Sequence, residues 1–183
     1  MAQKEPDKRD QITNANNAAT PSSYDPPDCE AVYASPPCFM HELDPVYLGY
    51  MGRDDIIKLL NELLEAERAG ARAVSEMSQQ PNHAEMQPVL RDVARDEARF
   101  CAMLTRHITD LGGAPSPATG PFYKKLIALQ DVSQRIDLLN RGQGWVVRKL
   151  QDTIPKIRDE LLHRDLKDML DVHEQNIRHC RQL

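Results

Sequence analysis

The sequence predicts an all-α protein, an up-down four-helix bundle that follows an N-terminal tail. Four long stretches carry apolar residues at alternating steps of three and four, which is the spacing of one helix face. Glycine is scarce, with 8 in 183 residues, and aromatic residues make up only 5% of the chain, which argues against a sandwich or barrel. A chain of this length can also bury a core without a structural metal or disulfide.

The N-terminal part of the chain differs in composition from the rest. Residues 1–37 hold six of the thirteen prolines and no glycine, so we expect a disordered tail whose apolar burial cannot offset its ordering entropy. Residues 38–53 mix apolar side chains with turn residues, which predicts a short irregular arm that packs on the bundle and covers one end or face. The four-helix bundle is expected over residues 54–183.

Two amphipathic helices are expected between residues 54 and 111. The first begins with Asp54 as its N-cap and ends before Pro81. The second begins near Pro88 and stops at Gly112 and Gly113. Their apolar positions are Ile56, Leu60, Leu63, Gly70, Val74 and Met77 in the first helix, and Leu90, Val93, Phe100, Leu104, Ile108 and Leu111 in the second.

The second half of the chain is expected to supply two more long helices. Residues 114–120 read as a loop rich in Pro, Ser and Gly, and a short helix is expected over 122–130. The third long helix starts near Val132 and is broken or kinked by Pro155, and the fourth covers about 164–181. Four long amphipathic helices with modest connections form a bundle.

Charge and hydropathy exclude two classes of partner. The net charge is −5 at pH 7, so no basic surplus is available to neutralise a phosphate backbone, and we expect no nucleic-acid partner. No apolar run has the length of a membrane span and the first residues show no signal-peptide core, so we expect a cytoplasmic protein without a membrane partner. The charged outer faces leave the oligomeric state open.

The four cysteines are expected to be free thiols. Cys29, Cys38, Cys101 and Cys180 form no Cys-x-x-Cys pair, and cytoplasmic proteins rarely keep disulfides. Cys38 and His41 stand three residues apart and could share a zinc ion, but the second pair that a zinc finger needs is missing.

Polar residues interrupt the apolar stripes near the middle of each long helix. A single polar residue at such a position is usually a solvated flank, but all four helices carry one, which favours a shared interior site. A carboxylate in a bundle interior must protonate, pair or bind a cation. Metal sites of helix bundles are built in this way. The interrupting residues are Glu67, Glu97, Gln143, His173 and Asn176.

At these residues the chain resembles the ferritin-like superfamily, above all bacterioferritin and rubrerythrin. Residues 60–67 (LNELLEAE) resemble the family's L-N-x-L-L-x-x-E, whose last Glu is a terminal iron ligand, and residues 96–100 (DEARF) resemble D-E-x-K-H. The later stretch 111–116 (LGGAPS) is similar to L-x-G-x-P-N, and residues 173–177 (HEQNI) stand where the family has E-E-G-H-I. The resemblance covers about residues 54–181 and implies a ferritin-like bundle that binds iron.

The resemblance also locates four departures from the family's di-iron site. Glu67 and Glu97 keep a terminal and a bridging carboxylate, whereas Phe100 stands in the place of a histidine. Gln143 occupies the position of a terminal Glu, and His173 and Asn176 replace the second bridging Glu and the second His. Two carboxylates balance one divalent cation, so the sequence predicts one metal per chain, iron first, with manganese or zinc as alternatives.

Three hypotheses follow for the function. In the first, Glu67, Glu97 and His173 ligate the metal of an oxidoreductase that uses O₂, peroxide or a small molecule, while Gln143 and Asn176 orient ligands or substrate. In the second, the bundle is a metal-free accessory or partner-binding protein whose two acids share a proton. In the third, a Glu–His pair performs acid–base chemistry without metal. Cys101 is either a further soft ligand or a small core thiol.

Overall fold

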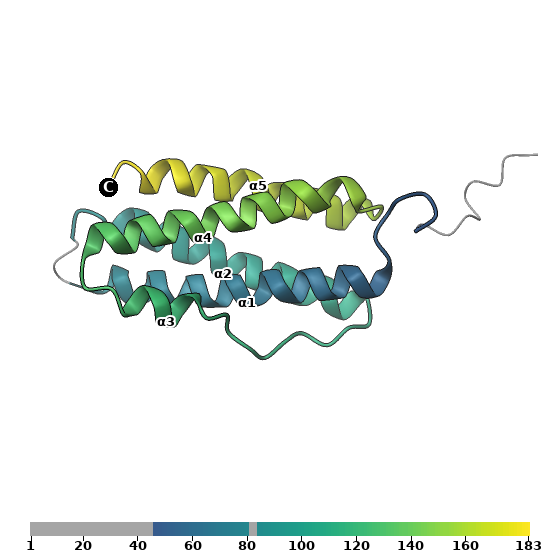
Figure 1. Ribbon diagram of the computed structural model, residues 1–183, viewed down its shortest axis with the longest axis horizontal. Helices are drawn as coiled ribbons and strands as arrows, with labels where there is room; N and C mark the ends of the chain where they lie inside the picture. The colour runs from purple at the N-terminus through teal and green to yellow at the C-terminus, as the bar shows by residue number, and fades with distance from the viewer. Residues whose placement is uncertain (1–45, 81–83) are drawn as a thin grey trace, which may run out of the picture. The chain divides into compact units, whose positions relative to one another are not determined.

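The computed structural model describes residues 46–80 and 84–183, which all belong to one compact unit, Met40–Leu183. Within this described part every regular element is a helix (Figure 1). The predicted tail (1–37), the first half of the predicted arm (38–45) and the Cys38–His41 pair lie outside it. The elements are α1 (Arg53–Ser78), α2 (Gln87–Asp110), α3 (Phe122–Ile127), α4 (Val132–Thr153), the 3₁₀ turn η3 (Ile154–Lys156) and α5 (Glu160–Cys180).

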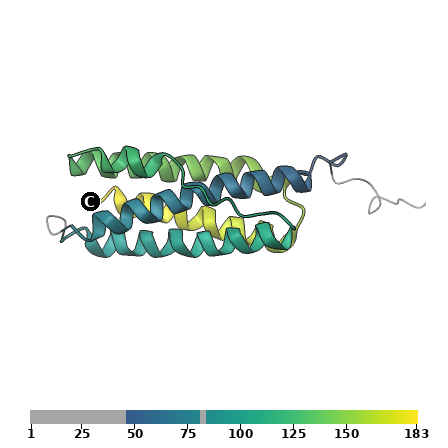
Figure 2. The same cartoon turned by 90° about the horizontal axis from the view of Figure 1, so that it is seen from below.

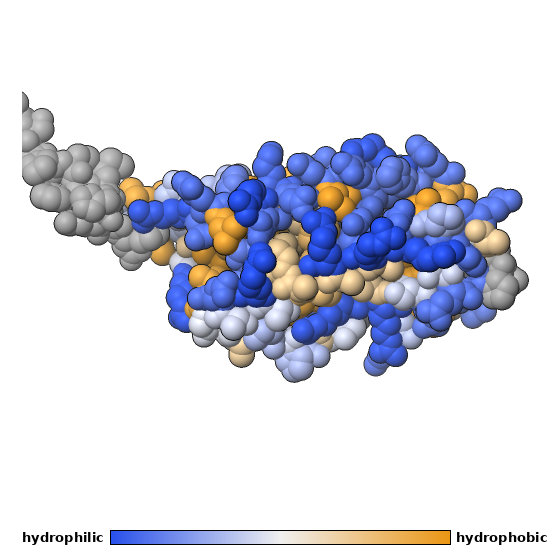
Figure 3. Space-filling model, turned by 180° about the vertical axis from the view of Figure 1, so that it is seen from behind, coloured by the Kyte–Doolittle hydropathy of each residue, from blue (hydrophilic) through white to orange (hydrophobic). Residues whose placement is uncertain are grey.

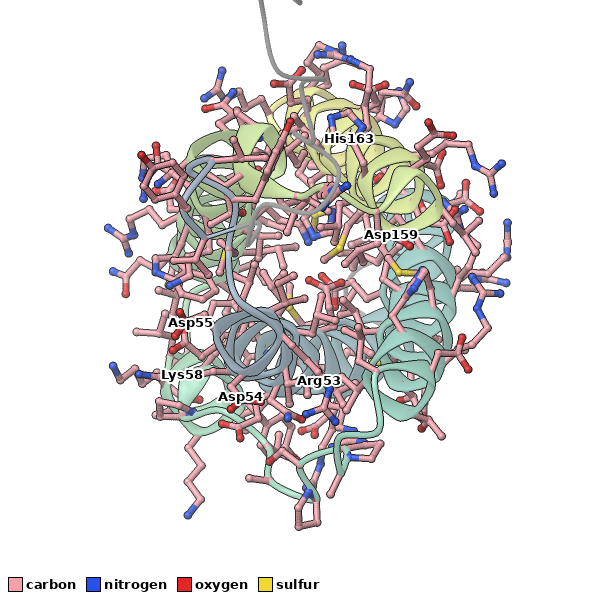
Figure 4. All side chains as sticks on the ribbon, turned by 90° about the vertical axis from the view of Figure 1, so that its right-hand side faces the viewer. Arg53, Asp54, Asp55, Lys58, Asp159 and His163 are labelled. Carbon is pink, nitrogen blue, oxygen red and sulfur yellow. The ribbon has the colours of Figure 1, made fainter. Side chains whose placement is uncertain are left out.

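The four long helices form a bundle, and the predicted fold class is therefore confirmed. Helix α1 packs along α2, and α4 packs along α5. The connection between α2 and α4 runs back along the outside of α1 and carries α3, so that α2 and α4 point in the same direction (Figures 1 and 2). Seen along the helices, most nitrogen and oxygen atoms project outward, with Arg53 of α1 and His163 of α5 at the same end (Figure 4).

The helix limits agree with the sequence pattern except at two N-termini and at the end of the short helix, which was expected to reach residue 130 but ends at Ile127. Helix α1 begins at Arg53 with Gly52 as its cap, so the prediction of Asp54 as N-cap was wrong. Asp54 lies in the first turn instead, where a carboxylate interacts favourably with the helix dipole. Helix α5 begins at Glu160, earlier than expected, because the Asp159 side chain accepts a hydrogen bond from the Leu162 amide.

The apolar core consists of two clusters. One lies around Leu60, Leu63, Leu104, Leu150 and Leu166, and the other around Val74, Met77, Leu90, Leu126 and Leu139. In each long helix the sequence passes from one cluster to the other through the polar residues that interrupt the apolar stripes. The polar residues therefore lie between two apolar regions, whose side chains offer them no hydrogen-bond partners.

The connection after α2 is fixed to α1 through Ser116. The Ser116 hydroxyl donates to Glu65 Oε1 at 2.5 Å, and its backbone N–H donates to Asn61 Oδ1 at 2.6 Å. Arg68 donates to the Ser116 carbonyl. Further along, the N–H of Gly120 donates to the carbonyl of Glu65 at 3.0 Å. These bonds hold residues 116–120 against the middle of α1, beside the polar layer.

The exterior is largely hydrophilic. On the side opposite to that of Figure 1, the strongly hydrophobic residues form small separate groups among hydrophilic ones (Figure 3). Among the residues that the structure describes, no helix combines the length and the apolar character needed to cross a bilayer. At one end of the bundle the N–H of Met51 donates to the carbonyl of Lys156 at 2.9 Å, so the last residues of the predicted arm contact η3.

Candidate functional site

Four polar side chains from four different helices are buried in the layer between the apolar clusters. Glu67 on α1 and Glu97 on α2 are each 2% exposed, Gln143 on α4 is 3% exposed and His173 on α5 is 1% exposed. Helical periodicity aims each of these positions at the bundle axis, since each continues an apolar stripe. The interior thus holds two carboxyl groups, one imidazole and one amide.

Glu67 and His173 form a hydrogen-bonded pair. His173 Nε2 lies 3.1 Å from Glu67 Oε1, and Nδ1 lies 2.9 Å from the carbonyl oxygen of Met169. A carbonyl can only accept, so Nδ1 carries a proton and Nε2 faces the carboxyl group. Burial alone lowers the pKa of His173, but the charge and hydrogen bond of Glu67 outweigh it, and the pKa of His173 lies above its ordinary value. The contact with Glu67 therefore favours the protonated form of His173.

Glu97 accepts a hydrogen bond from Gln143. The distance from Gln143 Nε2 to Glu97 Oε1 is 2.5 Å. Burial raises the pKa of Glu97 far above its ordinary value, and the charges of Glu67 and Asp96 raise it further, although the Gln143 bond acts in the opposite direction. Burial and the neighbouring charges therefore favour the protonated form of Glu97.

A glycine makes room for the Glu97 carboxyl group. A Cβ atom placed on Gly70 of α1 would lie 2.7 Å from Cδ of Glu97, closer than real Cβ atoms approach such a group. Glycine in a helix interior costs about 1 kcal/mol relative to alanine, so the position is costly for α1 by itself. The absence of a side chain at Gly70 leaves room for the buried Glu97 carboxyl group, and this offsets the cost.

Three oxygen atoms of the layer have no hydrogen-bond partner within the described residues. They are Glu67 Oε2, Glu97 Oε2 and Gln143 Oε1, and each is fully buried. Buried polar atoms without partners are rare in folded proteins, because each forfeits its hydration. All three side chains also line one cavity.

The three predicted metal ligands do not meet as one group. In the described ranges, no three His, Cys, Asp or Glu side chains are arranged so that they could hold a metal ion together. His173 is paired with Glu67, while Glu97 is paired with Gln143 on the opposite helix. The structure therefore divides the predicted ligands between two separate hydrogen-bonded pairs.

Asn176 and Phe100, which stand in the place of two histidines in the family resemblance, lie next to the buried polar residues. Asn176 is buried but donates to Asp96 Oδ2 at 3.3 Å, so it lies beside the other four residues and is not bonded to them. The ring of Phe100 packs against the ring of His173, with centroids 5.4 Å apart. This part of the interior is filled by an aromatic ring and a neutral amide.

A cavity of about 580 Å³ leads to the layer between α1 and α4. Its inner end is lined by Glu67, Glu97, Gln143 and His173, and its walls are mostly apolar. Part of the wall comes from the connection that Ser116 anchors, through Gly120, Pro121 and Phe122. The half-exposed Trp145 also lines this cavity. Small molecules therefore have a route from the surface to the buried acids.

The thiols of Cys101 and Cys180 are expected to be unreactive in the folded protein. Burial raises the pKa of Cys101 to about 12 and that of Cys180 to about 11, so neither forms a thiolate near pH 7. In a variant with Cys29 and Cys38 replaced by serine, a thiol reagent should react with both only after denaturation. Rapid modification of the folded variant would contradict this, and it would restore Cys101 as a candidate soft ligand.

Sequence reasoning missed several residues of this site. Gly70 was expected only as a small member of the apolar stripe, although a glycine three residues after Glu67 in a helix interior is a signal of close packing. Asp96, the partner of Asn176, was noted as the first residue of the DEARF motif and not as a member of the site. The cavity, with Trp145 in its wall, had no signal in the sequence, because it arises from the distance between α1 and α4.

Comparisons with known proteins agree on the fold. A family model described as "Domain of unknown function (DUF6306)" matches residues 54–182. No curated protein matches the sequence. Two solved structures are similar. One is of ferritin-like, diiron-carboxylate proteins from Bacillus anthracis str. Ames, with a TM-score of 0.64, 16% identity and coverage of 72% of this chain and 98% of that one.

The other is a dodecameric thioferritin, the bacterioferritin-related protein from Bacteroides fragilis. It has a TM-score of 0.61 and 15% identity, and the match covers 74% of this chain and 87% of that one. At sequence identities this low, the structural similarity shows a shared fold but does not show shared chemistry. The chain therefore has a ferritin-like fold, as the motifs of its first two helices predicted.

Proposed function

The chain belongs to the DUF6306 family, a domain of unknown function, and from its own interior we propose that it binds one divalent metal ion. Glu67, Glu97 and the amide oxygen of Gln143 would hold the ion, with His173 beside it. Iron is the first choice because the similar solved structures include diiron-carboxylate proteins, and manganese or zinc would suit the same ligands.

The interior residues do not fit a pair of iron ions. A di-iron centre of the ferritin-like type uses four carboxylates and two imidazoles, whereas this layer has two carboxylates and one imidazole. Phe100 and Asn176 offer no charge where a second ion would need it. Two carboxylates do balance the charge of one divalent ion, so the residues fit a single cation.

The three unpartnered oxygens of Glu67, Glu97 and Gln143 are the observation that carries the proposal. They are hard donors, they are fully buried, and the side chains that carry them line the same cavity. The bond from His173 Nδ1 to the Met169 carbonyl holds the imidazole ring in place beside Glu67.

The chain's own residues would control protons and access at such a site. Glu97 would have to give up its proton for its carboxylate to hold a cation, so binding should release a proton and strengthen as the pH rises. A bound iron ion would supply one-electron chemistry toward O₂ or peroxide. The apolar cavity walls would limit water and admit a small molecule.

A metal titration tests the proposal. Chelator-treated protein should bind about one Fe(II), Mn(II) or Zn(II) ion per chain in anaerobic calorimetry, since the layer offers one set of oxygens. Glu97→Gln keeps the shape of the side chain but removes its charge, so the affinity should fall by at least about tenfold. Elemental analysis of the purified protein provides a second measurement.

Glu174→Gln is the matched control for this titration. Glu174 lies on the same helix as His173 and accepts only a long bond, 3.4 Å, from Gln151 near the surface. This variant should bind metal as the unmodified protein does. Absence of binding in the unmodified protein, or equal affinities for both variants, would contradict the proposal; circular dichroism shows whether Glu97→Gln has folded.

A second candidate function needs no metal. Each buried acid already has one partner, His173 for Glu67 and Gln143 for Glu97, and no three ionisable ligands form a group in the described part. The bundle would then act as an accessory protein through its surface. If this is so, removal of metal leaves its melting temperature unchanged, whereas a bound ion raises it.

We also propose a cytoplasmic location and a small-molecule partner in place of a nucleic acid. The net charge of −5 at pH 7 argues against a nucleic-acid partner, and the cavity that reaches the buried acids favours a small molecule.

A further inference from the structure

The outer part of the cavity between α1 and α4 carries an imbalance of charge. Four charged side chains line it: Glu62 and Glu65 from α1, Lys125 from α3 and Arg141 from α4. Glu62 is neutralised by Lys149, whose Nζ lies 2.8 Å from its Oε2. Glu65 accepts the hydroxyl hydrogen of Ser116 at 2.5 Å, as part of the anchor of the connection.

The two cations have no such partners. Neither Lys125 nor Arg141 makes a side-chain hydrogen bond or ion pair with any residue that the structure describes. Both side chains are exposed at the cavity, so they are hydrated and available. An anionic group at the entrance would interact favourably with these two positive charges. One of them is a guanidinium group, which suits a carboxylate.

The surface between these cations and the buried acids is apolar. It is formed chiefly by Phe122 of α3, Leu138, Leu139 and Val146 of α4, and the half-exposed Trp145. A volume of about 580 Å³ lies within the range of small-molecule sites in proteins. Water finds few hydrogen-bond partners on the walls of an open apolar space of this size. Transfer of an apolar molecule from water into the space is therefore favourable in free energy.

We propose that this cavity binds a small amphipathic carboxylic acid. Its carboxylate lies at Lys125 and Arg141, and its apolar body extends along Phe122 and Leu139 toward the layer that contains Glu67 and Glu97. The proposal names the substrate class of the site proposed above and rests on that function for its chemistry. Binding of the acid itself requires only the cavity and the two cations, so it is measurable without metal.

Calorimetry with four probes tests the proposal on full-length, chelator-treated protein. Octanoate combines an apolar body with a carboxylate, octanol lacks the charge, octylamine reverses it, and acetate lacks the body. Octanoate should bind one molecule per chain and bind more tightly than the other three. The chain has a single tryptophan, Trp145, in the cavity wall, so its fluorescence should change over the same concentration range.

Two sets of variants distinguish the contribution of the ligand's carboxylate to binding from that of its apolar body. Lys125→Gln combined with Arg141→Gln should weaken octanoate about fivefold to tenfold and leave octanol unchanged, since two exposed charges are lost. The matched control, Lys124→Gln with Arg148→Gln, removes cations of the same two helices that do not line the cavity, and it should change neither affinity. Ala66→Phe fills the cavity from α1 and should weaken both probes.

Three results would overturn the proposal. One is the absence of saturable heat with octanoate, and another is tighter binding of octylamine, which would place the polar head at the buried acids. The third is an equal loss of octanoate and octanol in the double variant. Failure of metal binding with octanoate binding intact rejects only the proposed metal function, and the converse rejects only the carboxylic acid.

Discussion

Gly70→Ala is expected to lower the free energy of unfolding by about 1–2 kcal/mol, although alanine is the better helix former. The new methyl group would overlap the Glu97 carboxyl group, whose Cδ lies 2.7 Å from the ideal Cβ position. Glu97 cannot withdraw easily, because it is buried and bonded to Gln143. Crowding of a packed interior costs about 1–3 kcal/mol, which exceeds the propensity gain of about 1 kcal/mol.

The effect of this substitution should reverse its sign when Glu97 is shortened. In a Glu97→Ala background the space beside Gly70 is empty, so Gly70→Ala should stabilise the protein by about 1 kcal/mol through helix propensity and packing. Urea unfolding of the four proteins of this cycle gives the coupling energy between the two positions, expected at about 2–3 kcal/mol.

Gly144→Ala provides the matched glycine control. Gly144 also lies inside a long helix, but an added Cβ there would meet only Arg148 Nη1, at 3.5 Å. This change should stabilise the protein by up to about 1 kcal/mol. If Gly70→Ala is equally stabilising in the unmodified protein, Glu97 is not packed against α1, and the described site is incorrect.

Metal-free protein is expected to lose stability as the pH rises from about 5 to about 8. Burial raises the pKa of Glu97 above its ordinary value, and the Glu67 charge outweighs the effect of burial to raise that of His173. Both groups thus bind protons more tightly in the folded state than in the unfolded state. Stability then falls with pH, by up to about 1.4 kcal/mol per pH unit for each group.

The two groups act in different pH windows. For Glu97 the stabilisation is complete below the unfolded pKa of 4.5 and is lost as the pH rises toward its folded pKa. For His173 it is complete below 6.5 and is lost as the pH rises through its raised value. The slope should therefore steepen above about pH 6.5.

Urea unfolding at several pH values, with chelator present, measures this slope. Glu97→Gln removes the titrating acid, so the fall between about pH 5 and 6.5 should become shallower in that variant. Glu174→Gln, which removes an acid from the surface of α5, should keep the slope of the unmodified protein. Stability that rises toward pH 8 in metal-free protein would mean that Glu97 is ionised in the fold.

The bundle could be predicted because its helices follow one strong rule. Apolar residues at steps of three and four give long helices, and residues such as Pro155 and Gly112 mark where they end. The same periodicity gave the interior positions of Glu67, Glu97, Gln143 and His173, since each continues an apolar stripe. The N-cap at Asp54 failed because carboxylates are also favourable in the first turn of a helix.

The partners within the site could not be predicted in the same way. Helical periodicity places a side chain on a face but does not set the rotation of one helix against another, which decides that His173 meets Glu67 and not Glu97. Asn176 also follows its stripe, yet it bonds to Asp96 at the edge of the layer. The cavity depends on the spacing between α1 and α4, which no local pattern encodes.

Part of the cavity wall is formed by the connection between α2 and α4, and this bears on how the binding properties of the cavity can change. Gly120 and Pro121 belong to a surface segment, and such segments accept insertions and exchanges that helices of a packed core reject. Ser116 holds this segment on α1 by hydrogen bonds that depend little on the residues that follow. Substitutions at a few positions of this segment could therefore change which molecules the cavity admits, without any change in the buried acids or in the helices that carry them.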